Sequence, residues 1–111
     1  MKDYWFVIDY ETMTIEICFP DRMGNNINAC LATISEKEIR RMLEILQEID
    51  RNSKPVRLGY EYFTMDIDCG WIDCVFHMYD EPVRFFLYTE IFREALAEYL
   101  VTLDELMKSR D

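Results

Sequence analysis

Apolar residues recur at helical spacing in two stretches of the chain. In residues 35–51 they fall three or four positions apart, and Ser35 followed by Glu38 matches a capping box, in which each side chain satisfies a free backbone N–H of the other residue. Residues 90–109, with Thr89 as N-cap, carry a second apolar stripe. We therefore predict two amphipathic helices. The second stripe has the 4-3-4-3 spacing of a short heptad seam and consists of Phe92, Leu96, Tyr99, Leu103 and Leu106.

Elsewhere apolar and polar residues alternate with a period of two, which indicates half-buried β-strands. Residues 4–10 and 13–19 predict a first hairpin, and a shorter strand follows with Ile27, Ala29 and Leu31 on one side. After the first helix come three further predicted strands, with turns at residues 68–70 and 81–82. These strands cover residues 58–67, 71–80 and 83–88.

The order of these elements predicts one α+β domain spanning residues 1–111. We expect a two-layer sandwich, with a mostly antiparallel sheet of about six strands in βββα-βββα order and two amphipathic helices. Residues 9–19 align with 66–76 without a gap, which fits either a diverged duplication or two hairpins that share one hydrophobic pattern. If both helices cover the same side of the sheet, its other face is left open.

The predicted hairpin over residues 58–80 has two distinct faces. On one face alternation places Phe63, Met65, Cys74 and Phe76, which we expect to be buried. The opposite face mixes aromatic and acidic side chains, the composition of a protein-binding surface. The alternative is that a helix or loop covers these aromatic rings. With the adjoining turn, the predicted partner-binding residues are Tyr60, Tyr62, Asp66, Trp71, Asp73, His77, Tyr79, Asp80 and Glu81.

Net charge narrows the choice of partner. The chain has 22 acidic residues against 12 Lys and Arg, a formal charge of −10. Negative charge repels nucleic-acid phosphates and anionic membranes, so neither is an expected partner, whereas a basic protein surface is complementary. Residues 58–83 contain six acids and no Lys or Arg, so we expect the carboxylates of the predicted binding face to be unpaired. The alternative is that the acidity serves only solubility.

No pattern for catalysis or metal binding emerges. His77, the sole histidine, lacks a strand neighbour that could orient it as a general base. Cys69, Cys74 and His77 lack the close pairs typical of zinc sites, and residues 66–70 begin like a calcium loop but lack its later ligands. We therefore predict no enzyme activity, metal or other cofactor.

The four cysteines and the strand that begins near the N-terminus predict a cytoplasmic protein with reduced thiols. In composition the chain resembles small acidic α+β immunity proteins and phage-encoded inhibitors of nucleic-acid enzymes. We therefore expect an immunity- or antitoxin-like inhibitor that masks a basic surface on a toxin or nucleic-acid-processing enzyme. The alternative is a self-associating structural or scaffold domain, including a homodimer through the second helix.

Overall fold

The computed structural model describes residues 3–109 and has an α+β fold with six strands in two antiparallel sheets. The first part of the chain forms β1 (Trp5–Asp9), β2 (Thr14–Cys18), the 3-10 helix η1 (Arg22–Asn26), α1 (Ile27–Leu31) and α2 (Glu36–Glu48). The second part forms β3 (Val56–Gly59), β4 (Phe63–Ile67), β5 (Trp71–Phe76), β6 (Val83–Tyr88) and α3 (Thr89–Ser109).

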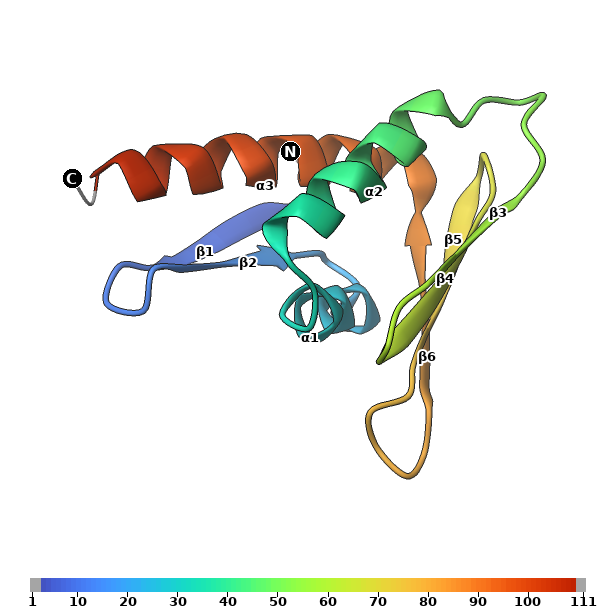
Figure 1. The fold of residues 1–111 in the computed structure, drawn as a ribbon, viewed down its shortest axis with the longest axis horizontal. Helices are drawn as coiled ribbons and strands as arrows, with labels where there is room; N and C mark the ends of the chain where they lie inside the picture. Colours follow the sequence, from blue (N-terminus) through green and yellow to red (C-terminus); the bar gives the residue numbers. More distant parts are fainter. Residues whose placement is uncertain (1–2, 110–111) are drawn as a thin grey trace.

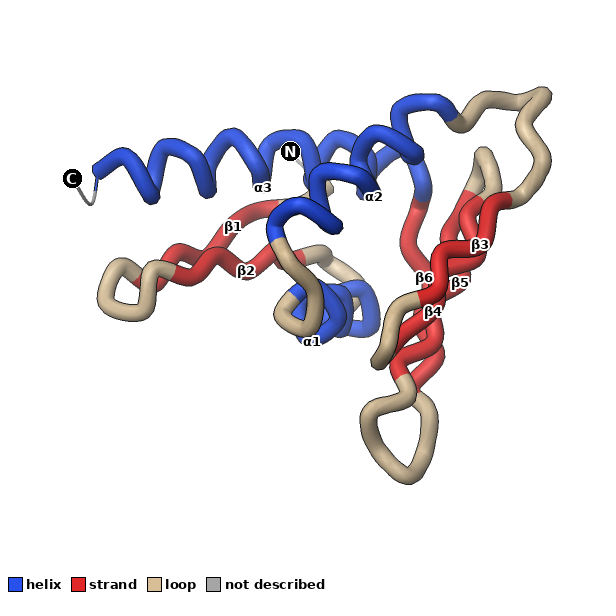
Figure 2. The backbone as a smooth tube through the Cα atoms, in the orientation of Figure 1, coloured by secondary structure: helices blue, strands red, loops and turns tan. Residues whose placement is uncertain are grey.

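All the helices lie on one side of the four-stranded sheet, whose strand order is β3-β4-β5-β6 (Figure 1). The β1–β2 hairpin is a separate sheet that runs along α3, and α1 lies between that hairpin and the larger sheet (Figure 2). The single sheet expected from the sequence is therefore divided in two. No described element covers the other side of the four-stranded sheet, so this face is open.

The strand predicted around Ile27, Ala29 and Leu31 was wrong, because these residues form helix α1. Ile27, Cys30 and Leu31 are buried and Ala29 is exposed, which is the three-and-four spacing of a helix. In so short an apolar run the two-residue period of a strand and the roughly 3.6-residue period of a helix both fit the sequence. Packing against the core selects the helix.

The single strand predicted over residues 58–67 was also wrong, because it contains the turn between β3 and β4. The Tyr60 N–H donates to the Phe63 carbonyl at 2.9 Å, and the two rings stack with centroids 4.5 Å apart. Only Gly59 marks this turn in the sequence. The observed order is therefore two strands, three helical segments, four strands and α3, rather than two βββα halves.

The predicted hairpin is confirmed for β4 and β5, although its second strand ends at Phe76 rather than at residue 80. Phe63 pairs with Phe76 and Met65 with Cys74, and all four side chains are buried on the helix-covered face. The Asp68 N–H closes the turn by donating to the Trp71 carbonyl at 3.0 Å.

The two hairpins differ in register. Asp9 pairs with Thr14 in the first, whereas Asp66 pairs with Asp73 in the second. The gap-free alignment of residues 9–19 with 66–76 would instead place Asp66 opposite Trp71. The sequence likeness therefore reflects the alternation of apolar and polar residues that both hairpins share, because their strands do not pair at equivalent positions.

Both predicted helices form. At the start of α2, Ser35 and Glu38 make the expected capping box, while Arg93 of α3 donates to the Leu46 and Ile49 carbonyls at the end of α2. Thr89 is fully buried, and its hydroxyl donates to the Asp68 carbonyl at 2.6 Å. The apolar stripe of α3, the second of the two predicted helices, faces the chain's own core. A homodimer through this helix would therefore lack an exposed seam. In this stripe Phe92, Leu96 and Leu106 are buried, and Tyr99 and Leu103 are partly buried.

An amide side chain covers the outer edge of β2. Asn28 of α1 accepts a hydrogen bond from the Ile17 N–H at 2.8 Å and donates to the Ile17 carbonyl at 2.7 Å. Asn25 accepts from the Phe19 N–H at 2.7 Å. Asn28 therefore bonds to the edge as a neighbouring strand would, and it fixes α1 against the hairpin.

Candidate functional site

The open face of the four-stranded sheet is the candidate site. Strand register sets its residues side by side, because directly paired residues share a face. Arg57 lies opposite Asp66, Asp66 opposite Asp73, and Asp73 opposite Phe86. The face consists of Arg57, Thr64, Asp66, Trp71, Asp73, Val75, Arg84, Phe86 and Tyr88.

Both central carboxylates of this face have an arginine neighbour, which corrects the expectation of unpaired acids. Arg57 Nε lies 2.7 Å from Asp66 Oδ1, and Arg84 Nε lies 3.8 Å from Asp73 Oδ1. The second pair is too long for a hydrogen bond. The buried Asp73 Oδ1 accepts no hydrogen bond from residues 3–109, so this carboxylate is only partly satisfied.

The hydrogen bond from Arg57 lowers the pKa of Asp66, and its positive charge acts in the same direction. A lowered folded-state pKa stabilises the fold at neutral pH, and that contribution is lost as pH falls through the lowered value. We expect Arg57→Gln to raise the pKa of Asp66 toward its ordinary value, as measured by carboxyl NMR titration. Arg41→Gln, which removes the Arg41–Glu44 pair on α2, is the control and should leave Asp66 unchanged. An Asp66 pKa equal to wild type in Arg57→Gln would contradict the assignment.

Three aromatic side chains, Trp71, Phe86 and Tyr88, form what we call the aromatic end of the open face. Their exposed fractions are 61%, 55% and 67%, respectively. Trp71 pairs across the strands with Tyr88, and the Trp71 and Phe86 ring centroids lie 6.5 Å apart. Large exposed rings grouped on a monomer surface are typical of interaction sites.

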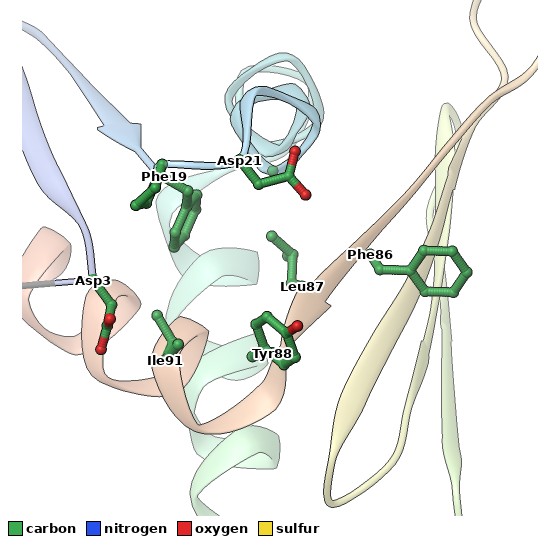
Figure 3. Close-up of a pocket in the computed structure, with 9 residues that line it drawn as sticks. Asp3, Phe19, Asp21, Phe86, Leu87, Tyr88 and Ile91 are labelled. Atoms are coloured by element: carbon green, nitrogen blue, oxygen red, sulfur yellow. The ribbon is translucent and has the colours of Figure 1, made fainter.

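A hollow of about 360 Å³ lies between the aromatic end and Asp21, which precedes η1. A second pocket of about 190 Å³ adjoins this hollow and shares Asp21 and part of β6 with it, and Phe19, Gly24 and Ile91 also line it. Figure 3 shows Phe86 and Leu87 leaving β6 in opposite directions, with the Asp21 carboxylate directed toward that strand. A charged group and three rings thus border one concave surface.

Tyr60, Tyr62 and Tyr79 do not join the aromatic end. Tyr60 and Tyr62 are partly buried against the core, and burial raises the pKa of Tyr60, with a further contribution from Glu38 of α2. Tyr79 contacts the edge of Phe76, which belongs to the covered face. For Tyr60 and Tyr62 the alternative in which the rings pack against the protein is the better description, whereas Tyr79 is 67% exposed beyond the end of β5.

The other predicted residues divide between two places. Asp66, Trp71 and Asp73 lie on the open face, as expected. His77 lies beyond the end of β5 and is exposed, and Asp80 and Glu81 are exposed in the loop that leads to β6. These three residues border the sheet rather than its open face.

Burial raises the pKa of two core thiols: that of Cys30 to about 12, and that of Cys74 further still. These thiols stay protonated at neutral pH, which makes them poor nucleophiles. Within the described range 3–109, no three His, Cys, Asp or Glu side chains gather as a metal site requires. None of the described helices is long and apolar enough to cross a membrane.

The sequence interpretation missed Phe86, Tyr88, Asp21 and the two pairing arginines. Alternation in 83–88 already places Arg84, Phe86 and Tyr88 together, and this signal could have extended the predicted face. Asp21 is remote in sequence and had no such signal. Comparison with protein-family models, curated proteins and solved structures found no match to this chain.

Proposed function

We propose that this protein acts by binding rather than by catalysis, as an acidic inhibitor that covers a basic surface of a partner protein. The observation that carries the proposal is the aromatic end of the open face, three rings more than half exposed beside the Asp21 carboxylate. Aromatic anchors supply contact area at little cost in conformational entropy, and acids around them select a basic partner.

Charge supports the same proposal in a specific way. At the centre of the open face the positive and negative charges offset each other within each pair, Arg57 with Asp66 and Arg84 with Asp73. The long-range attraction for a basic partner therefore comes from the surrounding acids. Such exposed charges mainly accelerate association, and salt screens them. An immunity- or antitoxin-like inhibitor of a nucleic-acid-processing enzyme fits this balance, since such enzymes carry basic surfaces for phosphate.

The test uses the immobilised full chain to capture partners from the source cell at low salt and at about 0.15 M salt. A basic protein should be retained by wild type and by Trp5→Ala, and Trp71→Ala should bind it at least about tenfold more weakly. Trp5 is the matched control because it is a half-exposed tryptophan on the other sheet. Adding the purified chain should then inhibit the activity of the captured protein.

Two outcomes would count against this proposal: binding that survives Trp71→Ala but is lost in Trp5→Ala, or capture without inhibition. The first would also favour the alternative of a self-associating scaffold if the captured protein is the chain itself. Trp5 and Val7 are both half exposed on the outer face of the β1–β2 hairpin, which makes that surface the best candidate for self-association. Sedimentation velocity at the capture concentration separates the two proposals.

A further inference from the structure

We propose that the hollow between Asp21 and the aromatic end receives an arginine side chain of the partner. This inference rests on the proposed function, because it names the group by which a basic protein would engage the open face. The hollow joins two features that bind cations. Aromatic rings attract a cation to their faces, and a carboxylate supplies an opposite charge. Here the features come from Trp71, Phe86, Tyr88 and Asp21.

The Asp21 carboxylate can accept hydrogen bonds from an incoming guanidinium. Its Oδ1 accepts a hydrogen bond from the Met23 N–H at 2.9 Å, and this bond orients the side chain at the start of η1. Among residues 3–109 no cation lies within ion-pairing distance of Asp21, so its charge is not offset within the described chain. A carboxylate can accept further hydrogen bonds on its second oxygen.

Neighbouring charges favour a cation in the hollow. Asp3 lines the adjoining pocket, Asp68 precedes Trp71 in the β4–β5 turn, and Glu90 follows β6 at the start of α3. The open face carries two arginines: Arg57 pairs with Asp66 and Arg84 lies against Asp73, and neither lines the hollow. Arg22 is exposed next to Asp21 but does not line the hollow.

Arginine fits these walls better than lysine does. A guanidinium is planar and weakly hydrated, so it stacks on an exposed ring while donating two parallel hydrogen bonds to a carboxylate. The aromatic end presents open ring surfaces beside the carboxylate rather than an enclosed cage. An ammonium, which is compact and strongly hydrated, would gain less on such an open surface.

The test needs no knowledge of the partner. The chain has two tryptophans, so an ¹⁵N–¹H spectrum of the full chain shows two indole N–H signals, and Trp5→Phe assigns them. The probe is an N-acetylated, C-amidated Gly-Arg-Gly peptide. Its citrulline counterpart is the neutral control of nearly the same shape, and its lysine counterpart tests the choice of cation.

We expect the arginine peptide to shift the Trp71 indole signal saturably and to leave the Trp5 signal in place. The citrulline peptide should bind about fivefold more weakly or worse, since it lacks the charge. Asp21→Asn should weaken arginine binding by a similar factor, because asparagine keeps the N-cap acceptor and loses only the charge. Asp9→Asn is the matched control, since Asp9 Oδ1 likewise accepts a backbone N–H, that of Glu11, at 2.9 Å.

Several results would overturn the arginine site. These are equal binding of the citrulline peptide, tighter binding of the lysine peptide, equal shifts at both indoles, or unchanged binding in Asp21→Asn. If the peptide fails while Trp71→Ala abolishes partner capture, the arginine site is wrong and the proposed function stands. If the peptide binds as expected while capture ignores Trp71→Ala, the proposed function is wrong instead.

Discussion

Phe85→Ala should lower the free energy of unfolding by about 3–5 kcal/mol, whereas Phe86→Ala should change it by less than about 1 kcal/mol. The two residues are neighbours in β6, but Phe85 is fully buried under the helices and Phe86 is 55% exposed on the open face. Removing the buried ring leaves a cavity and loses its transfer free energy. Urea denaturation followed by far-UV circular dichroism measures both effects.

The same pair of variants should behave in the opposite way toward the partner. Phe86→Ala should weaken binding because it removes part of the aromatic end, while any folded Phe85→Ala protein should retain the open face. Since a domain of this size is stable by only about 5–15 kcal/mol, the Phe85→Ala assay belongs at low temperature. Equal losses of stability in the two variants would mean that the faces of the four-stranded sheet are misassigned.

Asn28→Ala should destabilise the fold by about 2–4 kcal/mol, a large effect for a partly exposed polar side chain. Ile17 is fully buried, and the substitution leaves both its N–H and its carbonyl without the partner that Asn28 provides. Each unsatisfied buried group costs about 1–3 kcal/mol, partly offset where water enters. Thermal and urea unfolding measure the loss.

Two further substitutions make this prediction specific. Asn28→Asp keeps the acceptor for the Ile17 N–H and loses the donor to the Ile17 carbonyl. Its free energy of unfolding should therefore lie between those of the wild type and Asn28→Ala. Asn26→Ala is the matched control, because Asn26 is a neighbouring asparagine that makes no side-chain cap hydrogen bond. If Asn26→Ala lowers the free energy of unfolding as much as Asn28→Ala does, the loss reflects the stability of the start of α1 and not the contact of Asn28 with β2.

Local signals gave the sequence interpretation its successes. Ser35 and Glu38 act within a single helical turn, so their capping box could be identified without tertiary information. The β4–β5 hairpin was predictable because alternation on both strands meets at a turn containing Gly70. In each case the residues that define the element are close in sequence.

Contacts between distant residues account for the errors. Ile27, Cys30 and Leu31 form a helix because three buried positions meet the core, a choice that a five-residue run leaves open. Arg57 and Arg84 lie just outside the window of residues 58–83 that contains no base, yet cross-strand pairing brings them to Asp66 and Asp73. Charge counted along the chain therefore overstated the acidity of the face.

Several strand edges of this fold are short, charged or covered, and these features limit aggregation. Strands with free edge N–H and carbonyl groups recruit strands from other chains, and proteins limit this with charge, shortness or a covering segment. Here β3 spans four residues, follows Pro55 and carries Arg57, while η1 contacts β6. Asn28 occupies backbone groups on the edge of β2. These features disfavour strand addition at the edges of β2, β3 and β6, so a protein that approaches the four-stranded sheet meets the side chains of its open face rather than bare backbone.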